Sequence, residues 1–251
     1  MSDLLYKQWK KLGVGFVFCG EIRSPVDLEF LLVQTAKEGR EDSRLIFGMR
    51  GWLLENYDLV NTQRLIRLIK EEKKKNHSTA ILGAVLTSIV EAHPRSSLKS
   101  ILKYCQKSKK AVFVFPRIAK SEILAQLNKK ENHPIWARWN LISREMGTVQ
   151  GAIRKRSYIL RRNQNLLLRA IFGSGIRAEI LAFFLSCKKG NALHISNAVG
   201  LSYEPVYSEL QQIQALHLIQ DERKGRGRAR VYSFCNRAQK IFSSFLPQLV
   251  N

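Results

Sequence analysis

Apolar residues recur at intervals of three and four through most of the first 150 residues, which is the spacing of one face of an α-helix. Good capping residues stand before two of these stretches, Asp42 and Asn61. Two predicted helices begin directly after Asp42 and Asn61, and the others cover 27–37, 78–91, 96–107, 121–128 and 134–146. Helices of this length joined by short loops predict an α-helical bundle or stack.

The run 111–115 departs from this pattern, because it is rich in β-branched and aromatic residues and is followed by Pro116. Such a run fits either a short strand or an extended segment of the core. Both alternatives leave residues 1–150 as a mainly helical domain.

A different pattern organises the last third of the chain, where a short apolar helix runs into Gly200 and a second helix follows Ser202. Gly suits the left-handed position that ends a helix, and Ser suits the cap that starts the next one. In the second helix Val206, Leu210 and Ile213 recur at helical spacing, so we expect them to pack inward. The outer face is polar, and its candidate contact residues are Ser202, Tyr203, Glu204, Tyr207, Ser208 and Gln211. Two short helices with this turn and this outer face predict a helix-turn-helix that contacts DNA.

The stretch after this motif predicts a β-hairpin, because two alternating segments within 216–234 flank a Gly-rich turn. Its turn and shoulders carry five cations: Arg223, Lys224, Arg226, Arg228 and Arg230. Arg side chains suit a DNA contact, because they bond phosphate oxygens in pairs and can enter a narrow minor groove. A hairpin with an arginine-rich tip after a helix-turn-helix is the arrangement of a winged helix. Ahead of the motif, we expect a helix to end at Lys189-Gly190 and a short strand over 191–194.

Charge is distributed unevenly along the 251 residues, which carry 42 Lys+Arg against 20 Asp+Glu and a net charge of +22. Residues 1–72 hold 11 basic and 11 acidic side chains, whereas 73–150 hold 15 against 4 and 151–251 hold 16 against 5. A neutral front and a strongly basic remainder indicate that the remainder contacts a polyanion. The alternative is a generally basic protein with solvated cations.

Between the two regions lies a stretch of nine residues with five cations: Arg154, Lys155, Arg156, Arg161 and Arg162. These side chains could follow a phosphate backbone, or they could form a solvated helix face. The predicted organisation is an α-helical domain over 1–150, a basic connector over 151–164 and a winged helix-turn-helix domain over 165–251.

Residues 166–236 resemble the winged helix-turn-helix domain of ArsR-type and MarR-type regulators. The matching stretches are Ile195–Ser202, Val206–Ile213, Leu218-Ile219 and Gly225–Tyr232. The resemblance implies sequence-directed binding of double-stranded DNA as a homodimer, with the second helix in the major groove and the wing on the backbone.

Two features depart from these families. Metal-sensing members place paired thiolates on their helices, whereas Cys187 and Cys235 are single and far apart in sequence. Glu204 and Glu209 lie on or near the predicted recognition helix, and a carboxylate there repels phosphate while it can accept from cytosine. Winged helices also serve as protein-docking domains. Because of these glutamates, a wing that binds no DNA remains the alternative to DNA binding.

The sequence contains no pattern that indicates a cofactor, a metal site or a membrane span. The four cysteines include no CxxC pair, and the apolar run 80–90 is too short to cross a bilayer. The segment 12–19 resembles a signal-peptide core but lacks the small residues of a cleavage site. We therefore expect a cytoplasmic protein.

A nucleotidyltransferase is the enzyme hypothesis that the sequence offers. Asp27 and Glu29 follow Gly20 in a way faintly similar to the metal-binding carboxylates of nucleotidyltransferases, but Glu21 replaces the expected Ser. Two carboxylates at i and i+2 share a face only on a strand, and this stretch predicts a helix start. We expect no catalytic activity.

Three hypotheses follow from the sequence. The first is a transcription regulator whose N-terminal helical domain serves oligomerisation, sensing or partner binding. The second is an adaptor that assembles a nucleoprotein or protein complex without operator specificity. The nucleotidyltransferase is the remote third.

Overall fold

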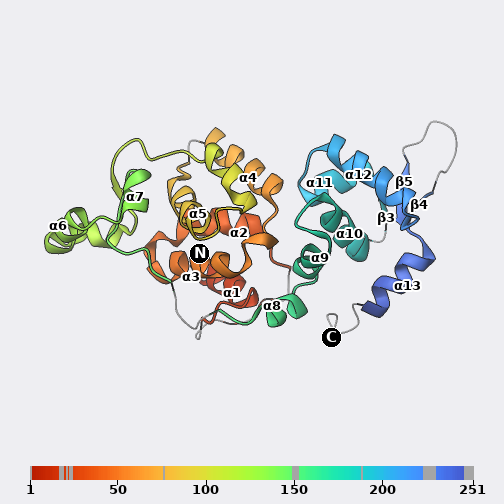
Figure 1. The fold of residues 1–251 in the computed structure, drawn as a ribbon, viewed down its shortest axis with the longest axis horizontal. Coiled ribbons are helices and arrows are strands. Elements are labelled where there is room, and N and C mark those ends of the chain that lie inside the picture. Colours follow the sequence, from red (N-terminus) through yellow and green to blue (C-terminus); the bar gives the residue numbers. More distant parts are fainter. Residues whose placement is uncertain are drawn as a thin grey trace. The chain divides into compact units, whose positions relative to one another are not determined.

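The computed structural model describes residues 2–16, 20, 22, 25–75, 77–148, 153–187, 189–222 and 230–245, and its elements are mainly helices (Figure 1). The chain divides into two compact units, Met1–Ile159 (unit 1) and Leu160–Asn251 (unit 2). This division falls inside the stretch that we expected to be a basic connector.

Unit 1 is built from α-helices with short 3-10 helices (η) between them. Its α-helices are α1 (Ser2–Lys11), α2 (Leu28–Glu38), α3 (Ser43–Asn56), α4 (Thr62–Lys74), α5 (Ala80–Ala92), α6 (Glu122–Lys130), α7 (Pro134–Arg138) and α8 (Arg156–Arg162), the last of which crosses into unit 2. The 3-10 helices are η1 (Gly39–Glu41), η2 (Tyr57–Leu59), η3 (Ser97–Tyr104) and η4 (Pro116–Lys120), and two short strands are β1 (Val112–Phe113) and β2 (Leu141–Ile142).

The caps predicted at Asp42 and Asn61 are confirmed, and Asp27, which was expected inside its helix, is the cap of α2. The side chains of Asp27, Asp42 and Asn61 accept hydrogen bonds from the free amides at the starts of α2, α3 and α4. The apolar faces then pack around α5, which lies in the middle of unit 1 and is buried along ten consecutive residues (Figure 1). Its Gly83 leaves room for the ring of Trp139, whose indole N–H donates to Thr87 Oγ1 at 3.0 Å.

The helix predicted over 134–146 is wrong beyond Arg138. Asn140 has φ 55°, a left-handed value that stops the helix, and Leu141-Ile142 then pair in parallel with Val112-Phe113. Of the two alternatives for 111–115, the strand is therefore confirmed. The stretch 96–107 also differs from its prediction, because it forms a 3-10 helix that ends at Tyr104.

Unit 2 has five helices and three strands in its described part. They are α9 (Gln164–Phe172), α10 (Ile176–Cys187), β3 (Lys189–Asn191), α11 (Ala192–Val199), α12 (Tyr203–Ala215), β4 (Ile219–Asp221), β5 (Val231–Phe234) and α13 (Asn236–Phe245). The strands form one antiparallel sheet in the order β3-β5-β4, with Gly190 opposite Tyr232 and Gln220 opposite Ser233. The sequence pattern missed α1, α9 and α13.

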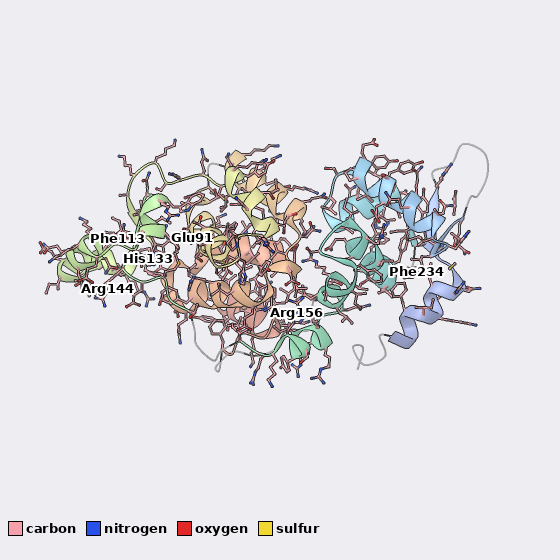
Figure 2. The ribbon with its side chains drawn as sticks, viewed as in Figure 1. Glu91, Phe113, His133, Arg144, Arg156 and Phe234 are labelled. Carbon is pink, nitrogen blue, oxygen red and sulfur yellow. The ribbon has the colours of Figure 1, made fainter. Side chains whose placement is uncertain are left out.

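Gly190 was expected to end α10, but it lies in β3. A Cβ atom there would come within 2.9 Å of the Phe183 ring, so the absence of a side chain lets the strand approach α10. The short strand expected at 191–194 is also shifted, because α11 already begins at Ala192. Phe234 of β5 packs between α10 and α13, with its ring 5.3 Å from that of Phe184 and 5.2 Å from that of Phe242 (Figure 2).

Candidate nucleic-acid interface

The turn between α11 and α12 is fixed by Gly200, whose φ of 66° is left-handed. The Leu201 N–H donates to the Ser196 carbonyl at 3.0 Å, and the Gly200 N–H donates to the Asn197 carbonyl at 3.2 Å. This pair of bonds closes the end of α11, and the buried Leu201 side chain anchors the chain just beyond it. The predicted helix end is confirmed, and the turn sets the direction in which α12 leaves.

The inner face of α12 consists of Val206, Leu210 and Ile213, which are fully buried as predicted. They pack against Ile195 of α11, against the phenylalanines of α10 and against Tyr232 of β5. One apolar cluster thus joins three helices and the sheet, and it holds the opposite face of α12 outward.

The outer face of α12 is polar and open to solvent. Its residues Ser202, Tyr203, Glu204, Ser208 and Gln211 are exposed, and Tyr207 is half-buried. Ser202 occupies the N-cap position, but its hydroxyl accepts no bond from the helix amides. The start of α12 therefore presents a hydroxyl and helix amides, which are groups that suit an anion or a base edge.

Glu209 lies on the flank of α12 and is neutralised by α10. The Arg177 Nε donates to Glu209 Oε1 at 2.5 Å, and its Nη2 donates to Gln212 Oε1 at 3.2 Å. The Glu209 side chain is only 17% exposed, against 38% for Arg177. The repulsion between this glutamate and phosphate, which the sequence suggested, is therefore largely offset within the protein. Glu204 remains an exposed carboxylate in the first turn.

A hollow of about 380 Å³ lies between the start of α12, the start of α11 and strand β5. The rings of Tyr203 and Tyr207 stack along one side, with centroids 5.8 Å apart and planes 9° apart. The other lining residues are Asn191, Ala192, Leu193, Arg230 and Tyr232. An aromatic wall facing a guanidinium is suited to a sugar-phosphate group or a base.

The Tyr232 hydroxyl at this hollow is fully buried and has no hydrogen-bond partner of normal geometry among the described residues. Burial raises the pKa of Tyr232, and the nearby Arg230 opposes that rise. Arg230 itself pairs with Asp221 of β4, Nε to Oδ2 at 3.6 Å. The base of the hollow thus holds a neutral phenol beside a cation.

Strands β4 and β5 pair antiparallel, as the predicted hairpin requires. Of the five predicted cations of the hairpin, Arg230 directly precedes β5. The other four, Arg223, Lys224, Arg226 and Arg228, lie outside the described residues. The Glu222 N–H donates to the Val231 carbonyl at 2.7 Å, and the Ser233 hydroxyl donates to Glu222 Oε1 at 2.7 Å. These bonds hold Glu222 at the end of β4 against Val231 and Ser233 of β5.

Comparisons with family models, with curated proteins and with solved structures gave no match. No helix in the described part of the chain is both long and apolar enough to cross a membrane.

The basic stretch at the boundary of the units is helical from Arg156, and its cations differ in their surroundings. Arg156 forms two bonds to the Asp58 carboxylate, at 2.7 and 2.6 Å (Figure 2). The bonds raise the pKa of Arg156 and lower the pKa of Asp58. Arg154 lies 5.9 Å from the ring centre of Tyr158. Lys155, Arg161 and Arg162 have exposed side chains. Arg156 therefore has a structural role, whereas Arg154 and Lys155 on the preceding segment have exposed side chains.

Asp27 and Glu29, the carboxylates of the nucleotidyltransferase hypothesis, have structural partners. Asp27 caps α2 and pairs with Arg64, and the fully buried Glu29 accepts from the Asn61 N–H at 2.8 Å. Within the described residues, no group of three or more His, Cys, Asp or Glu side chains is placed to hold a metal ion. Cys187 and Cys235 are both free thiols.

Two members of the candidate interface were not found from the sequence, Arg177 and Tyr232. Arg177 lies in the first turn of α10, a place where a cation has no local reason to be. A cation at this unfavourable position could have indicated that Arg177 has an acidic partner elsewhere in the fold. Tyr232 alternates inward on β5 and has no local signature.

Proposed function

We propose that this protein is a DNA-binding transcription regulator in which residues 165–251 form a winged helix-turn-helix. The observation that carries the proposal is the opposition of the two faces of α12. Three fully buried residues fix its inner face, while a polar face without any large aliphatic side chain is held outward. A helix fixed in this way after a left-handed Gly turn supports the assignment of α12 as a recognition helix.

In this proposal α12 enters the major groove, and its residues divide by role. Gln211 and Ser208 contact base edges, since an amide can bond adenine in two places and a hydroxyl can bond several bases. The Tyr207 hydroxyl contacts a base edge as well. Tyr203 lines the path of the backbone together with Arg230, which lines the same hollow. The arginines of the β4–β5 segment bind phosphates and supply most of the affinity of this domain.

The proposal also covers the location of the protein, its oligomeric state and the role of unit 1. The regulator acts in the cytoplasm as a homodimer that binds two half-sites, as the resemblance implies. Unit 1 serves oligomerisation, sensing or partner binding, and the chain has no catalytic role.

The deciding test is competition binding of the full chain at fixed salt. Selection from a random duplex library, followed by competition with unselected duplex, should give a preference of at least about a thousandfold. Tyr207→Ala and Gln211→Ala should relax the selected motif at one or two positions, at a cost of about 1–3 kcal/mol for the affected base pair. The matched control is Gln239→Ala, which removes an exposed amide from another helix of unit 2 and should leave the motif unchanged.

Equal affinity for all duplexes would refute the regulator and support the adaptor instead. Exposed apolar groups beside the hollow, Leu193 at 57% and Tyr203 at 42%, would then be the first candidates for a protein contact.

A further inference from the structure

Unit 1 carries a concentrated positive surface that the proposed function does not use. Between Glu91 and Glu122 the sequence has no acidic residue and eight cations: Arg95, Lys99, Lys103, Lys107, Lys109, Lys110, Arg117 and Lys120. Among the residues that the structure describes, only Arg117 of these eight has a carboxylate within 4.0 Å. The other seven have no counter-charge at this distance within the part of the chain that the structure describes.

Part of this surface is assembled by the packing of η3 on α4. Leu98 and Ile101 are fully buried and bring Tyr104, at the end of η3, next to α4. The Lys70 ammonium of α4 then lies 4.9 Å from the ring centre of Tyr104, and the Lys103 ammonium lies 5.2 Å from it. Two like charges are thus held within roughly 10 Å of each other by one ring.

A third lysine, Lys73, follows Lys70 by three residues in α4, so the two lie on the same face of the helix. The charge of Lys73 opposes the rise in the pKa of Cys105, which burial raises to about 12. The acidic residues of the same helix do not neutralise the group, because Glu71 pairs with Arg67 and Glu72 pairs with Lys37 and His77. The helix thereby directs its carboxylates to other partners and leaves these three ammonium groups together.

The segment that continues the surface is fixed at several points. The Gln106 N–H donates to Thr79 Oγ1 at 2.8 Å, and the Asn140 amide donates to the Ser108 carbonyl at 2.7 Å. Lys107, Lys109 and Lys110 project from this fixed backbone with exposed side chains. Cations on a fixed backbone lose less freedom when they bind a chain of phosphates than cations on a mobile loop would.

We propose that Lys70, Lys73, Lys99, Lys103, Lys107, Lys109 and Lys110 (the lysine surface) form a second contact for nucleic acid, which binds backbone phosphates irrespective of base sequence. Lysine ammonium groups act as point charges that suit phosphates without demanding a base. Tyr104 fixes two of the ammonium groups and so sets their spacing. This contact extends the proposed function, and it stands or falls separately from base recognition by α12.

The test compares two triple variants of the full chain that remove the same charge from unit 1. One is Lys70→Gln, Lys73→Gln and Lys103→Gln; the control is Lys120→Gln, Lys129→Gln and Lys130→Gln. The control residues belong to η4 and α6, and α6 lies at the opposite end of unit 1 from α4 (Figure 1). Binding to a random-sequence duplex is measured by fluorescence anisotropy from 50 to 200 mM salt, and circular dichroism confirms that both variants fold.

We expect the first triple to reduce the slope of log K against log salt by about 2–3, since each lost phosphate contact removes about 0.9. Its affinity should fall about tenfold to a hundredfold on every duplex, with the selected motif of α12 unchanged. The control triple should keep the wild-type slope to within about half a unit. Equal losses in the two triples would overturn the proposal, because they would show a response to net charge alone.

Two further results distinguish this proposal from membrane binding and from the proposed regulator function. If the first triple loses binding to phosphatidylserine vesicles while duplex binding is unchanged, the surface serves a membrane and the proposal is wrong. If the triple lowers the slope while Tyr207→Ala and Gln211→Ala leave base preference unchanged, the lysine surface stands and the proposed regulator falls.

Discussion

The ion pair between Arg177 and Glu209 gives the sharpest test of the interface, because it decides the charge that α12 presents. Arg177→Ala removes the guanidinium and leaves a carboxylate with 17% exposure unpaired, whereas Glu209→Gln removes the negative charge and frees Arg177. Exposed ion pairs contribute about 0.2–1 kcal/mol, and the burial of Glu209 with the added bond to Gln212 places this pair at about 1 kcal/mol. Arg177→Ala should therefore lower the free energy of unfolding by about 1–2 kcal/mol, since a partly buried carboxylate also loses its donors.

The same variants should shift DNA affinity in opposite directions. An unpaired carboxylate about 10 Å from a phosphate costs about 0.4 kcal/mol in water, so two or three phosphates give about 1 kcal/mol. Arg177→Ala should therefore weaken duplex binding roughly fivefold at low salt, and Glu209→Gln should strengthen it by a similar factor. The double variant has the same net charge as the wild type and should bind within about twofold of it.

The assay is a double-mutant cycle, with unfolding followed in urea and binding followed by anisotropy at two salt concentrations. A coupling free energy near 1 kcal/mol in unfolding would support the pair. A coupling below about 0.3 kcal/mol would show that Arg177 does not hold Glu209. Weaker binding by Glu209→Gln would show instead that the carboxylate contacts the DNA, for example by accepting from a cytosine.

Two predictions concern unit 1. Gly51→Ala should stabilise the fold by about 0.5–1 kcal/mol, because its Cβ would lie in ordinary contact 3.7 Å from Ile153. Gly83→Ala should destabilise the fold by about 1–3 kcal/mol, because its Cβ would lie 2.5 Å from the Trp139 ring. Urea unfolding of the two variants should therefore show changes of opposite sign. Hydrogen bonds from Arg44 lower the pKa of Asp42 to about 2. The ionised Asp42 carboxylate therefore stabilises the fold fully above about pH 4, and this stabilisation is lost as the pH falls toward 2. Asp42→Asn keeps the cap and should make the free energy of unfolding less dependent on pH in this window.

Local rules were sufficient for much of the helical fold. The caps at Asp42 and Asn61 could be predicted because an N-cap depends only on its own side chain and the next three amides. The inward face of α12 could be predicted because helical spacing brings Val206, Leu210 and Ile213 to one side. The three short strands of unit 2 have three or four residues with little alternation, and only the β4–β5 pair had a turn signal between them.

Elements that depend on distant partners could not be predicted. The stretch 134–146 is apolar at helical spacing, but Leu141 and Ile142 gain more by pairing with β1, and the left-handed Asn140 allows that turn. The sequence contains no sign that these two residues meet a strand thirty positions earlier. In the candidate interface, the same reason hid the partner of Glu209, because α10 reaches α12 only through the packed core.

If the protein is the proposed regulator, the placement of charge implies that base selection and affinity are carried by different parts of the chain. Within the described residues of α12, one glutamate is neutralised by Arg177 and the other faces solvent, so the outer face of the helix offers no net attraction to phosphate. A helix of this kind contributes to binding only where its hydrogen-bonding groups meet the right bases, because nothing else holds it against the duplex. In the proposal, attraction comes from Arg230 in unit 2 and from the lysine surface in unit 1, and it falls with salt while hydrogen bonds to bases do not. The proposed regulator should therefore become more selective as salt rises, losing random duplex faster than its preferred site. A selectivity that stays constant or falls between 50 and 200 mM salt would show that the cations themselves depend on sequence, and would contradict this division of labour.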